Sequence, residues 1–179
     1  MQYYYLRASL PMLFLEQPPP LAFTDYADAC DTQLNPTDRR GFKALFEDPA
    51  VSSDHRFVRR WRETDTLIRD AIVRQRAQRA RVDPADHVHG SDLNVGIERG
   101  VAKAFSTQNP LERERALDAL RWEHLEAATM AAPFSADAVL AYGLELRLAE
   151  RWAALDTERG KDTLNELLTR EAGPGETST

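Results

Sequence analysis

The residues of this sequence best suited to metal chemistry are two histidines, His87 and His89, which a single residue separates. Three acidic residues lie close to them in the sequence, Asp83, Asp86 and Asp92. Imidazole and carboxylate groups bind Zn²⁺, but a zinc site needs three or four ligands in tetrahedral geometry, usually with spacings such as CxxC or HExxH. Neither spacing occurs here. We therefore predict a surface loop with two histidines, and a helical metal protein or enzyme is the last-ranked alternative.

The usual motifs of nucleophilic catalysis and phosphate binding are absent. The sequence contains no GxSxG, no GxxxxGK[ST] and no GxGxxG, so neither an esterase-type serine nor a nucleotide-binding loop is indicated. Acidic residues between 112 and 123 alternate with arginines, which is typical of surface i,i+4 pairs rather than of an acid/base pair. We predict no catalytic residue, no bound metal and no cofactor.

An arginine-rich segment extends from Asp54 to Arg81. It holds nine arginines and four acidic residues, a net charge of +5, whereas residues 112–171 carry thirteen acidic and eight basic residues, a net charge of −5. Such a face could bind an acidic protein or RNA, but its arginines could equally pair with the acidic helices of the same chain. The predicted partner-interface residues are arginines of this segment and two tyrosines of the N-terminus: Arg56, Arg59, Arg60, Arg69, Arg74, Arg76, Arg79, Arg81, Tyr3 and Tyr4.

The elements that must position these residues are helices. Ala, Leu, Arg and Glu, all strong helix formers, dominate the composition, and no Asn-Gly or Asp-Gly hairpin turn occurs. We predict an all-α fold, a bundle of about six to seven helices. Its long helices are expected near 53–81, 110–130 and 136–171, with shorter helices at 24–34, at 36–46 and after Ser91 or Asp92.

Capping residues mark where several of these helices begin. Asn35-Pro36 and Asn109-Pro110 each place an N-cap side chain directly before a proline at the first helical position. Ser135 is expected to open the last long helix, and Ser52 or Ser53 to cap the arginine-rich one.

The length and hydrophobic content suit one domain. The chain has 179 residues, 42% of them hydrophobic, and we expect a single helical domain over residues 1–172. If it is divided into two lobes, they should meet near 82–91. Residues 173–179, small and polar, are expected to form a disordered tail.

Charge, cysteine content and the N-terminus restrict the class of protein further. The net charge of −6 disfavours nucleic-acid binding by the molecule as a whole, because phosphate binding needs a positive surface. One cysteine, Cys30, allows no internal disulfide and fits a reducing compartment. The apolar stretch 1–15 is interrupted by Arg7 and Pro11, so we expect neither a signal peptide nor a membrane span.

Three stretches resemble an uncharacterised bacterial family encoded among the subunits of V-type (A/V-type) ATPases. They are Tyr3-Tyr4-Tyr5-Leu6-Arg7-Ala8-Ser9-Leu10-Pro11, the run from Asn109 to Asp118 with Arg121-Trp122, and the run from Leu140 to Trp152. Together they touch both ends of the chain. The resemblance implies a shortened relative of the C (eukaryotic d) subunit of V-type ATPases, a helical protein that also opens with a tyrosine-rich helix.

What the resemblance implies about function follows from the place of that C-type protein in the enzyme. It sits between the central stalk and the membrane ring of proteolipid subunits and transmits torque without binding nucleotide. We therefore expect a non-catalytic subunit or assembly factor that couples or bridges the stalk and the ring, in the cytoplasm and peripheral to the inner membrane through the complex. The alternative is a stand-alone adaptor or regulator that binds an acidic protein or RNA through the arginine-rich helix.

Overall fold

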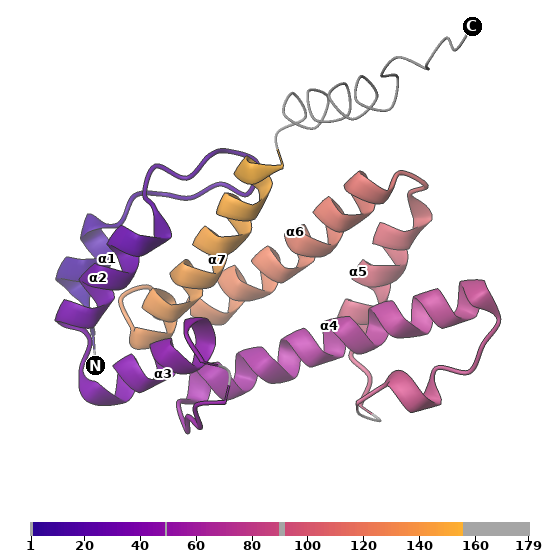
Figure 1. The fold of residues 1–179 in the computed structure, drawn as a ribbon, viewed down its shortest axis with the longest axis horizontal. Coiled ribbons are helices and arrows are strands. Elements are labelled where there is room, and N and C mark those ends of the chain that lie inside the picture. The colour runs from indigo at the N-terminus through magenta and orange to yellow at the C-terminus, as the bar shows by residue number, and fades with distance from the viewer. Residues whose placement is uncertain (1, 49, 90–91, 156–179) are drawn as a thin grey trace, which may run out of the picture.

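The computed structural model describes residues 2–48, 50–89 and 92–155. Within these residues the chain forms seven α-helices and one 3₁₀ turn, with no strand, which confirms the predicted all-α fold (Figure 1). The elements in chain order are α1 (Tyr4–Ser9), α2 (Phe23–Gln33), α3 (Pro36–Phe46), α4 (Arg56–Ala80), η1 (Ala85–His87), α5 (Val95–Ser106), α6 (Pro110–Thr129) and α7 (Ala136–Ala154).

Three of the predicted helix starts are confirmed by capping hydrogen bonds. The side chain of Asn35 accepts a bond from the backbone N–H of Asp38 at the start of α3, over 2.9 Å. Asn109 caps α6 in the same way, and Ser135 caps α7. These side chains satisfy backbone N–H groups that have no partner inside the helix.

Three helix starts differ from the prediction, that of α2 by a single residue, since the helix begins at Phe23 rather than at Thr24. The N-cap of α4 is His55 rather than Ser52 or Ser53, because its Nδ1 accepts the backbone N–H of Phe57. Helix α5 begins at Val95 rather than directly after Ser91 or Asp92, because the side chain of Asn94 accepts the N–H groups of both Gly96 and Ile97.

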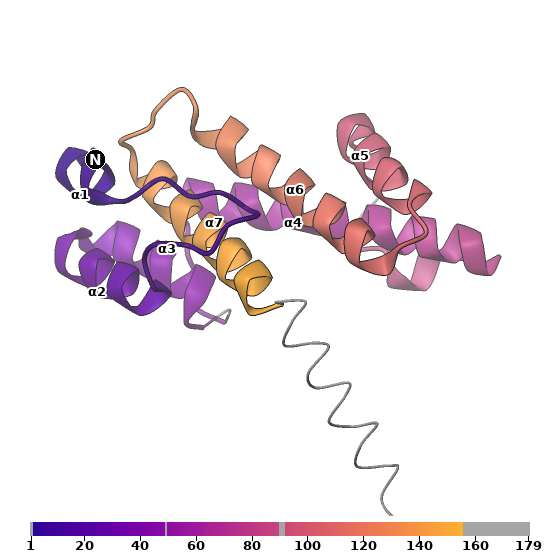
Figure 2. The same ribbon diagram turned by 90° about the horizontal axis from the view of Figure 1, so that it is seen from above.

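Helix α4 is the longest element, and the others pack along it in two groups. Helices α5 and α6 cover its C-terminal half, while α3 and the neighbouring helices α1, α2 and α7 gather at its N-terminal half (Figures 1 and 2). Helix α6 then leads back to α7, which packs against α2 and α3. The consecutive helices α4 to α7 therefore form the frame on which the N-terminal helices sit.

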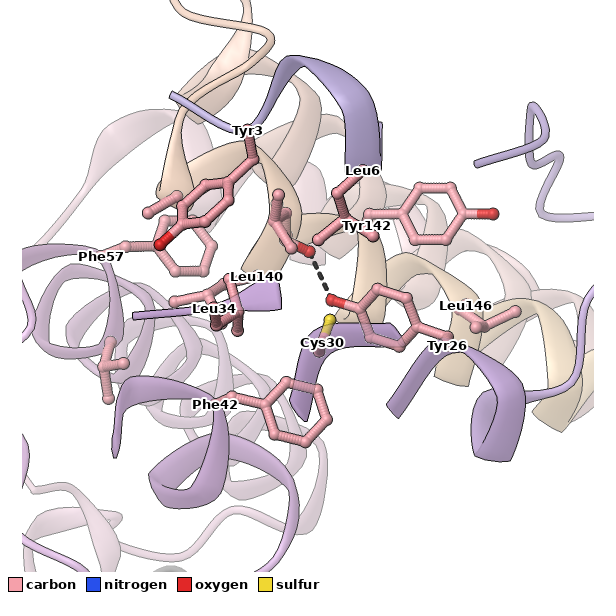
Figure 3. Close-up of a cluster of buried hydrophobic side chains, with 14 of the residues drawn as sticks. Tyr3, Leu6, Tyr26, Cys30, Leu34, Phe42, Phe57, Leu140, Tyr142 and Leu146 are labelled. Carbon is pink, nitrogen blue, oxygen red and sulfur yellow. Dashed lines mark hydrogen bonds between the residues drawn. The ribbon is translucent and has the colours of Figure 1, made fainter. Parts of the chain in front are cut away.

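The larger hydrophobic cluster lies where α1, α2, α3 and α7 meet (Figure 3). Tyr26 is completely buried there, and its hydroxyl donates a 2.6 Å hydrogen bond to the backbone carbonyl of Val139. Burial raises the pKa of Tyr26 well above its ordinary value, so the ring stays neutral. A Cβ atom at Gly143 would lie 2.7 Å from both the Tyr26 and Phe46 rings, so this close approach of helices requires glycine.

A second, smaller cluster fills the space between α4, α5 and α6. Its members are Ile68, Ala71, Ile72, Ile97, Val101, Ala104, Phe105 and Leu117. On α4 the division between the two clusters falls between Trp61 and Leu67.

The last predicted long helix is described in part. Helix α7 begins at Ala136 as expected and is described to Ala154, while residues 156–171 and the predicted tail 173–179 lie outside the described residues. No helix among the described residues combines the length and the apolar character that crossing a bilayer demands.

Candidate functional site

A hollow of the described surface lies between the segment 11–17 and helices α6 and α7. It encloses about 770 Å³. The segment follows α1 and crosses above α7 (Figure 2). It is fixed there by the buried side chain of Leu13 and by a 3.0 Å hydrogen bond from the Tyr142 hydroxyl to the carbonyl of Pro11. We call this hollow the groove; its lining residues are Arg7, the segment 11–17, Trp122, Glu126, Thr129, Met130, Pro133, Ala138, Tyr142 and Glu145.

Glu145 of α7 is the most unusual polar residue of the groove. It is only 9% exposed, and its carboxyl group makes no hydrogen bond or ion pair with any described residue. The pKa of Glu145 is raised to about 7, chiefly by burial. Of the two nearby charges, the guanidinium of Arg7 lowers this pKa and the carboxylate of Glu126 raises it. The loss of hydration disfavours the charged carboxylate. Glu145 therefore changes charge near neutral pH.

Arg7 enters the groove from α1 without forming an ion pair among the described residues. Its guanidinium lies over the Tyr142 ring, 5.1 Å from the ring centre, a cation–π arrangement. Its Nε atom is buried and has no hydrogen-bond partner within the described part of the chain. Burial also raises the pKa of Tyr142 to about 12. The Arg7 guanidinium is thus positioned by the Tyr142 ring, while its Nε–H lacks a hydrogen-bond acceptor among the described residues.

The rim of the groove is apolar. Met12, Phe14 and Met130 are 74%, 51% and 78% exposed. Next to Pro133, which lines the groove, Phe134 packs on the ring of Tyr4 with 4.9 Å between ring centres. Large apolar side chains gathered around one hollow mark a surface suited to binding another molecule.

A second group of polar residues surrounds the buried Asp38, whose carboxylate is fully hydrogen-bonded. Its carboxylate accepts hydrogen bonds from the Tyr3 hydroxyl, the Asn35 amide and Nε2 of His55. Because Nδ1 of His55 accepts the Phe57 N–H, the ring proton must be on Nε2. Burial and the bond to Asp38 raise the pKa of Tyr3 to about 12. The group ties the start of α1 to α3 and α4, and we assign it a structural role.

The two predicted interface tyrosines, Tyr3 and Tyr4, differ in their exposure to solvent. Tyr3 is 6% exposed and belongs to the larger hydrophobic cluster. Tyr4 is 59% exposed and lies against Phe134, beside the groove. Only Tyr4 therefore has a side chain that a partner could contact without rearrangement.

Half of the eight predicted interface arginines pair with a residue of this chain, either on α4 itself or on another element. Arg56 pairs with Asp137 at 3.0 Å, Arg69 with Asp65 at 2.6 Å, and Arg74 with Glu98 of α5. Arg79 donates to the carbonyl of Phe105 and lies over its ring. The remaining four are exposed and make no ion pair within the described residues: Arg59, Arg60, Arg76 and Arg81.

The two histidines of the predicted surface loop lie on or beside η1 and are accessible to solvent. The backbone N–H of His89 donates to the buried carboxylate of Asp70, and its Nδ1 lies 3.3 Å from the same group. No cluster of three or more His, Cys, Asp or Glu side chains with metal-binding geometry occurs among the described residues.

No motif in the sequence predicted the groove. Arg7 and Glu145, two of its charged residues, belong to no sequence motif that would indicate a binding site. A signal was present at Glu145, a carboxyl group in the run Val139 to Leu148 that is otherwise mostly apolar. In such a run a lone acidic residue is buried on at least one side, which usually has a functional or structural cause.

Part of the chain matches the model of a known protein family. Residues 95–171 match the model of a family described as "Protein of unknown function (DUF2764)". No curated protein and no solved structure matches the chain. The matched region starts at α5 and includes α6 and α7, and with them the wall of the groove that carries Trp122, Glu126 and Glu145; the α1 residue Arg7 and the segment 11–17 lie before it. This chain is therefore similar, over less than half of its length, to a family whose description gives no function.

Proposed function

We propose that this chain is a non-catalytic helical protein that works by binding other proteins. The observation that carries the proposal is the rim of the groove, where Met12, Phe14 and Met130 are each more than half exposed. Exposing apolar side chains to water costs free energy that a partner recovers by covering them. The two hydroxyls that line the groove are engaged with the backbone, since Tyr142 donates to the carbonyl of Pro11 and Thr129 to the carbonyl of Leu125.

We further propose that the assembly it joins is a bacterial V-type ATPase, as a subunit or assembly factor that couples or bridges the central stalk and the membrane ring. The support is the sequence resemblance of Tyr3 to Pro11, of Asn109 to Trp122 and of Leu140 to Trp152. Such a role requires long helices that do not slide against one another. The 25 residues of α4 and the buried contacts between α6 and α7 are compatible with it. The proposal places the chain in the cytoplasm, peripheral to the inner membrane through the complex.

The test is an affinity purification of the tagged full chain from its native membranes, with the co-purifying proteins identified by mass spectrometry. We expect the stalk and ring subunits of the V-type ATPase in near-equal amounts. Replacing Met12 and Met130 by serine should reduce their recovery by about tenfold or more, because the rim would lose its apolar surface.

The matched control is Leu93→Ser. Leu93 is 66% exposed but is not among the residues that line the groove, so this variant should recover the complex like the wild type. If no ATPase subunit is recovered while the complex itself stays intact, the V-type ATPase assignment is wrong. If the complex is recovered equally well with the double serine variant, the rim is not the contact surface.

A second function is favoured by one observation. Arg59, Arg60 and Arg76 project from α4 without an ion pair in the described part of the chain, which suits an adaptor that binds an acidic protein or RNA. Binding of this kind would weaken steeply with added salt.

A further inference from the structure

We propose that the groove binds an apolar segment of a partner protein that carries a lysine or arginine, with the cationic group placed against Glu145 and Glu126. This inference rests on the protein-binding role proposed above, but not on which assembly the partner belongs to. It specifies the chemistry of the segment that fits the groove.

The first argument is charge. Three carboxyl groups line the groove, those of Glu16, Glu126 and Glu145, against the single guanidinium of Arg7. Arg7 is directed over the Tyr142 ring and forms no ion pair with a glutamate in the described residues. The groove therefore has an excess of negative charge, which favours a cationic ligand and repels phosphate groups.

The second argument is the burial of Glu145. Glu145 is only 9% exposed as a residue, and its carboxyl group lacks a hydrogen-bond partner among the described residues, so its ionisation is costly. Glu126, in contrast, has a hydrogen-bond partner, because it accepts a 3.1 Å hydrogen bond from the indole N–H of Trp122. A basic side chain entering the groove would supply Glu145 with the missing partner, and the charged pair would be shielded from water.

The third argument is the apolar surface around these carboxyl groups. Two of the exposed rim residues, Met12 and Met130, are methionines, whose flexible side chains adapt to the shape of a ligand. Trp122 and Phe14 add aromatic surface. With about 770 Å³, the groove lies in the size range that encloses several side chains. An amphipathic segment with apolar residues flanking one basic residue matches both parts of the surface.

The experiment uses photo-crosslinking at the rim. A photoreactive phenylalanine analogue is introduced at Met130 of the full chain, and at Leu93 as the control position. After irradiation in native membranes, the crosslinked partner peptides are sequenced. We expect crosslinks at position 130 to an apolar peptide that contains Lys or Arg, and a lower yield in the Glu145→Gln background but not in Glu123→Gln, which changes a carboxylate of α6 outside the groove.

The outcomes separate this inference from the proposed function. A basic apolar peptide from a protein outside the V-type ATPase supports the inference and contradicts the ATPase assignment. An acidic peptide, a peptide from a second copy of this chain, or no crosslink at position 130 while the stalk subunits still co-purify would overturn the inference and leave the proposed function standing.

A synthetic peptide of the crosslinked segment then gives a second readout. The charged groups that act on Glu145 are Arg7 from α1 and Glu126 from α6, and Glu16 from the segment 11–17 lines the same groove. Because the pKa of Glu145 is about 7 in the free protein, the ionised form that binds the cation decreases from pH 8 to pH 6. The affinity should fall about tenfold over this range. In Glu145→Gln this dependence should disappear; an equal dependence in both proteins contradicts the inference.

Discussion

At the scale of single residues, Glu145 shows how burial changes the chemistry of a common side chain. Its pKa is raised from the ordinary 4.5 to about 7, chiefly by loss of hydration. The folded state therefore binds this proton more tightly than the unfolded state. A raised carboxyl pKa means that ionisation opposes folding, so this group lowers the stability of the protein as the pH rises from about 4.5 to about 7, and the penalty persists above pH 7.

We predict from this that Glu145→Gln stabilises the protein relative to the wild type at pH 8 but much less at pH 4. The shift corresponds to about 3 kcal/mol of differential stability between the two pH values. Urea unfolding at both pH values measures it, with Glu123→Gln as the control because Glu123 is exposed. If the free energies of unfolding of the wild type and of Glu145→Gln differ by the same amount at pH 4 and at pH 8, the assigned burial of Glu145 is contradicted.

At the scale of elements, Asp118 joins α6 to the end of α7. It is fully buried, and its carboxylate accepts a hydrogen bond of 2.9 Å from Arg121 on its own helix. From α7 it accepts 2.9 Å and 3.0 Å hydrogen bonds from Arg151 and from the indole N–H of Trp152. This single carboxylate thus fixes the register of the two helices that form one wall of the groove.

Asp118→Ala should destabilise the protein by about 3 kcal/mol, because it removes three hydrogen bonds to a fully buried carboxylate. Glu114→Ala removes another carboxylate near Arg151, at 3.6 Å, but this pair is exposed, so its loss should cost about 1 kcal/mol or less. Thermal or urea unfolding of the two variants compares them directly. Equal costs would show that Asp118 contributes no more than a surface pair.

At the scale of the whole molecule, the two hydrophobic clusters are held together by helices that contribute to both. Helix α4 supplies Phe57 and Val58 to the larger cluster and Ile68 and Ala71 to the smaller one. The arginines of α4 also differ in what they contact. Arg74 and Arg79 attach the helix to α5, whereas others project from the molecule.

Exchanging Arg59, Arg60 and Arg76 for glutamine should therefore leave the free energy of unfolding almost unchanged, while Arg74→Gln and Arg79→Gln together should lower it by about 1–3 kcal/mol. Urea unfolding of the two variants measures this difference. If the groove is the contact surface, the triple variant should still recover the complex from membranes. Loss of the complex with the triple variant, and its retention with the serine rim variant, would favour the adaptor that binds through α4.

The sequence alone was sufficient for the class of fold and for the starts of α3, α6 and α7. Asn35, Asn109 and Ser135 act within three residues of the helices they cap, and such signals can be found without knowing the fold. His55 was missed because histidine is not among the usual N-cap residues. Its ring accepts the N–H of Phe57 only in an orientation that Asp38, seventeen residues earlier, helps to fix.

The tertiary structure decided which of these residues form a site. The groove exists because the segment 11–17 lies across α7, where Tyr142 bonds to Pro11 from 131 residues further along the chain. Glu145 and Glu123 are both glutamates of predicted helices, yet one is buried and the other exposed. Hydration, and with it the pKa and the need for a partner, depends on which distant side chains displace water, and no local pattern of residues contains that information.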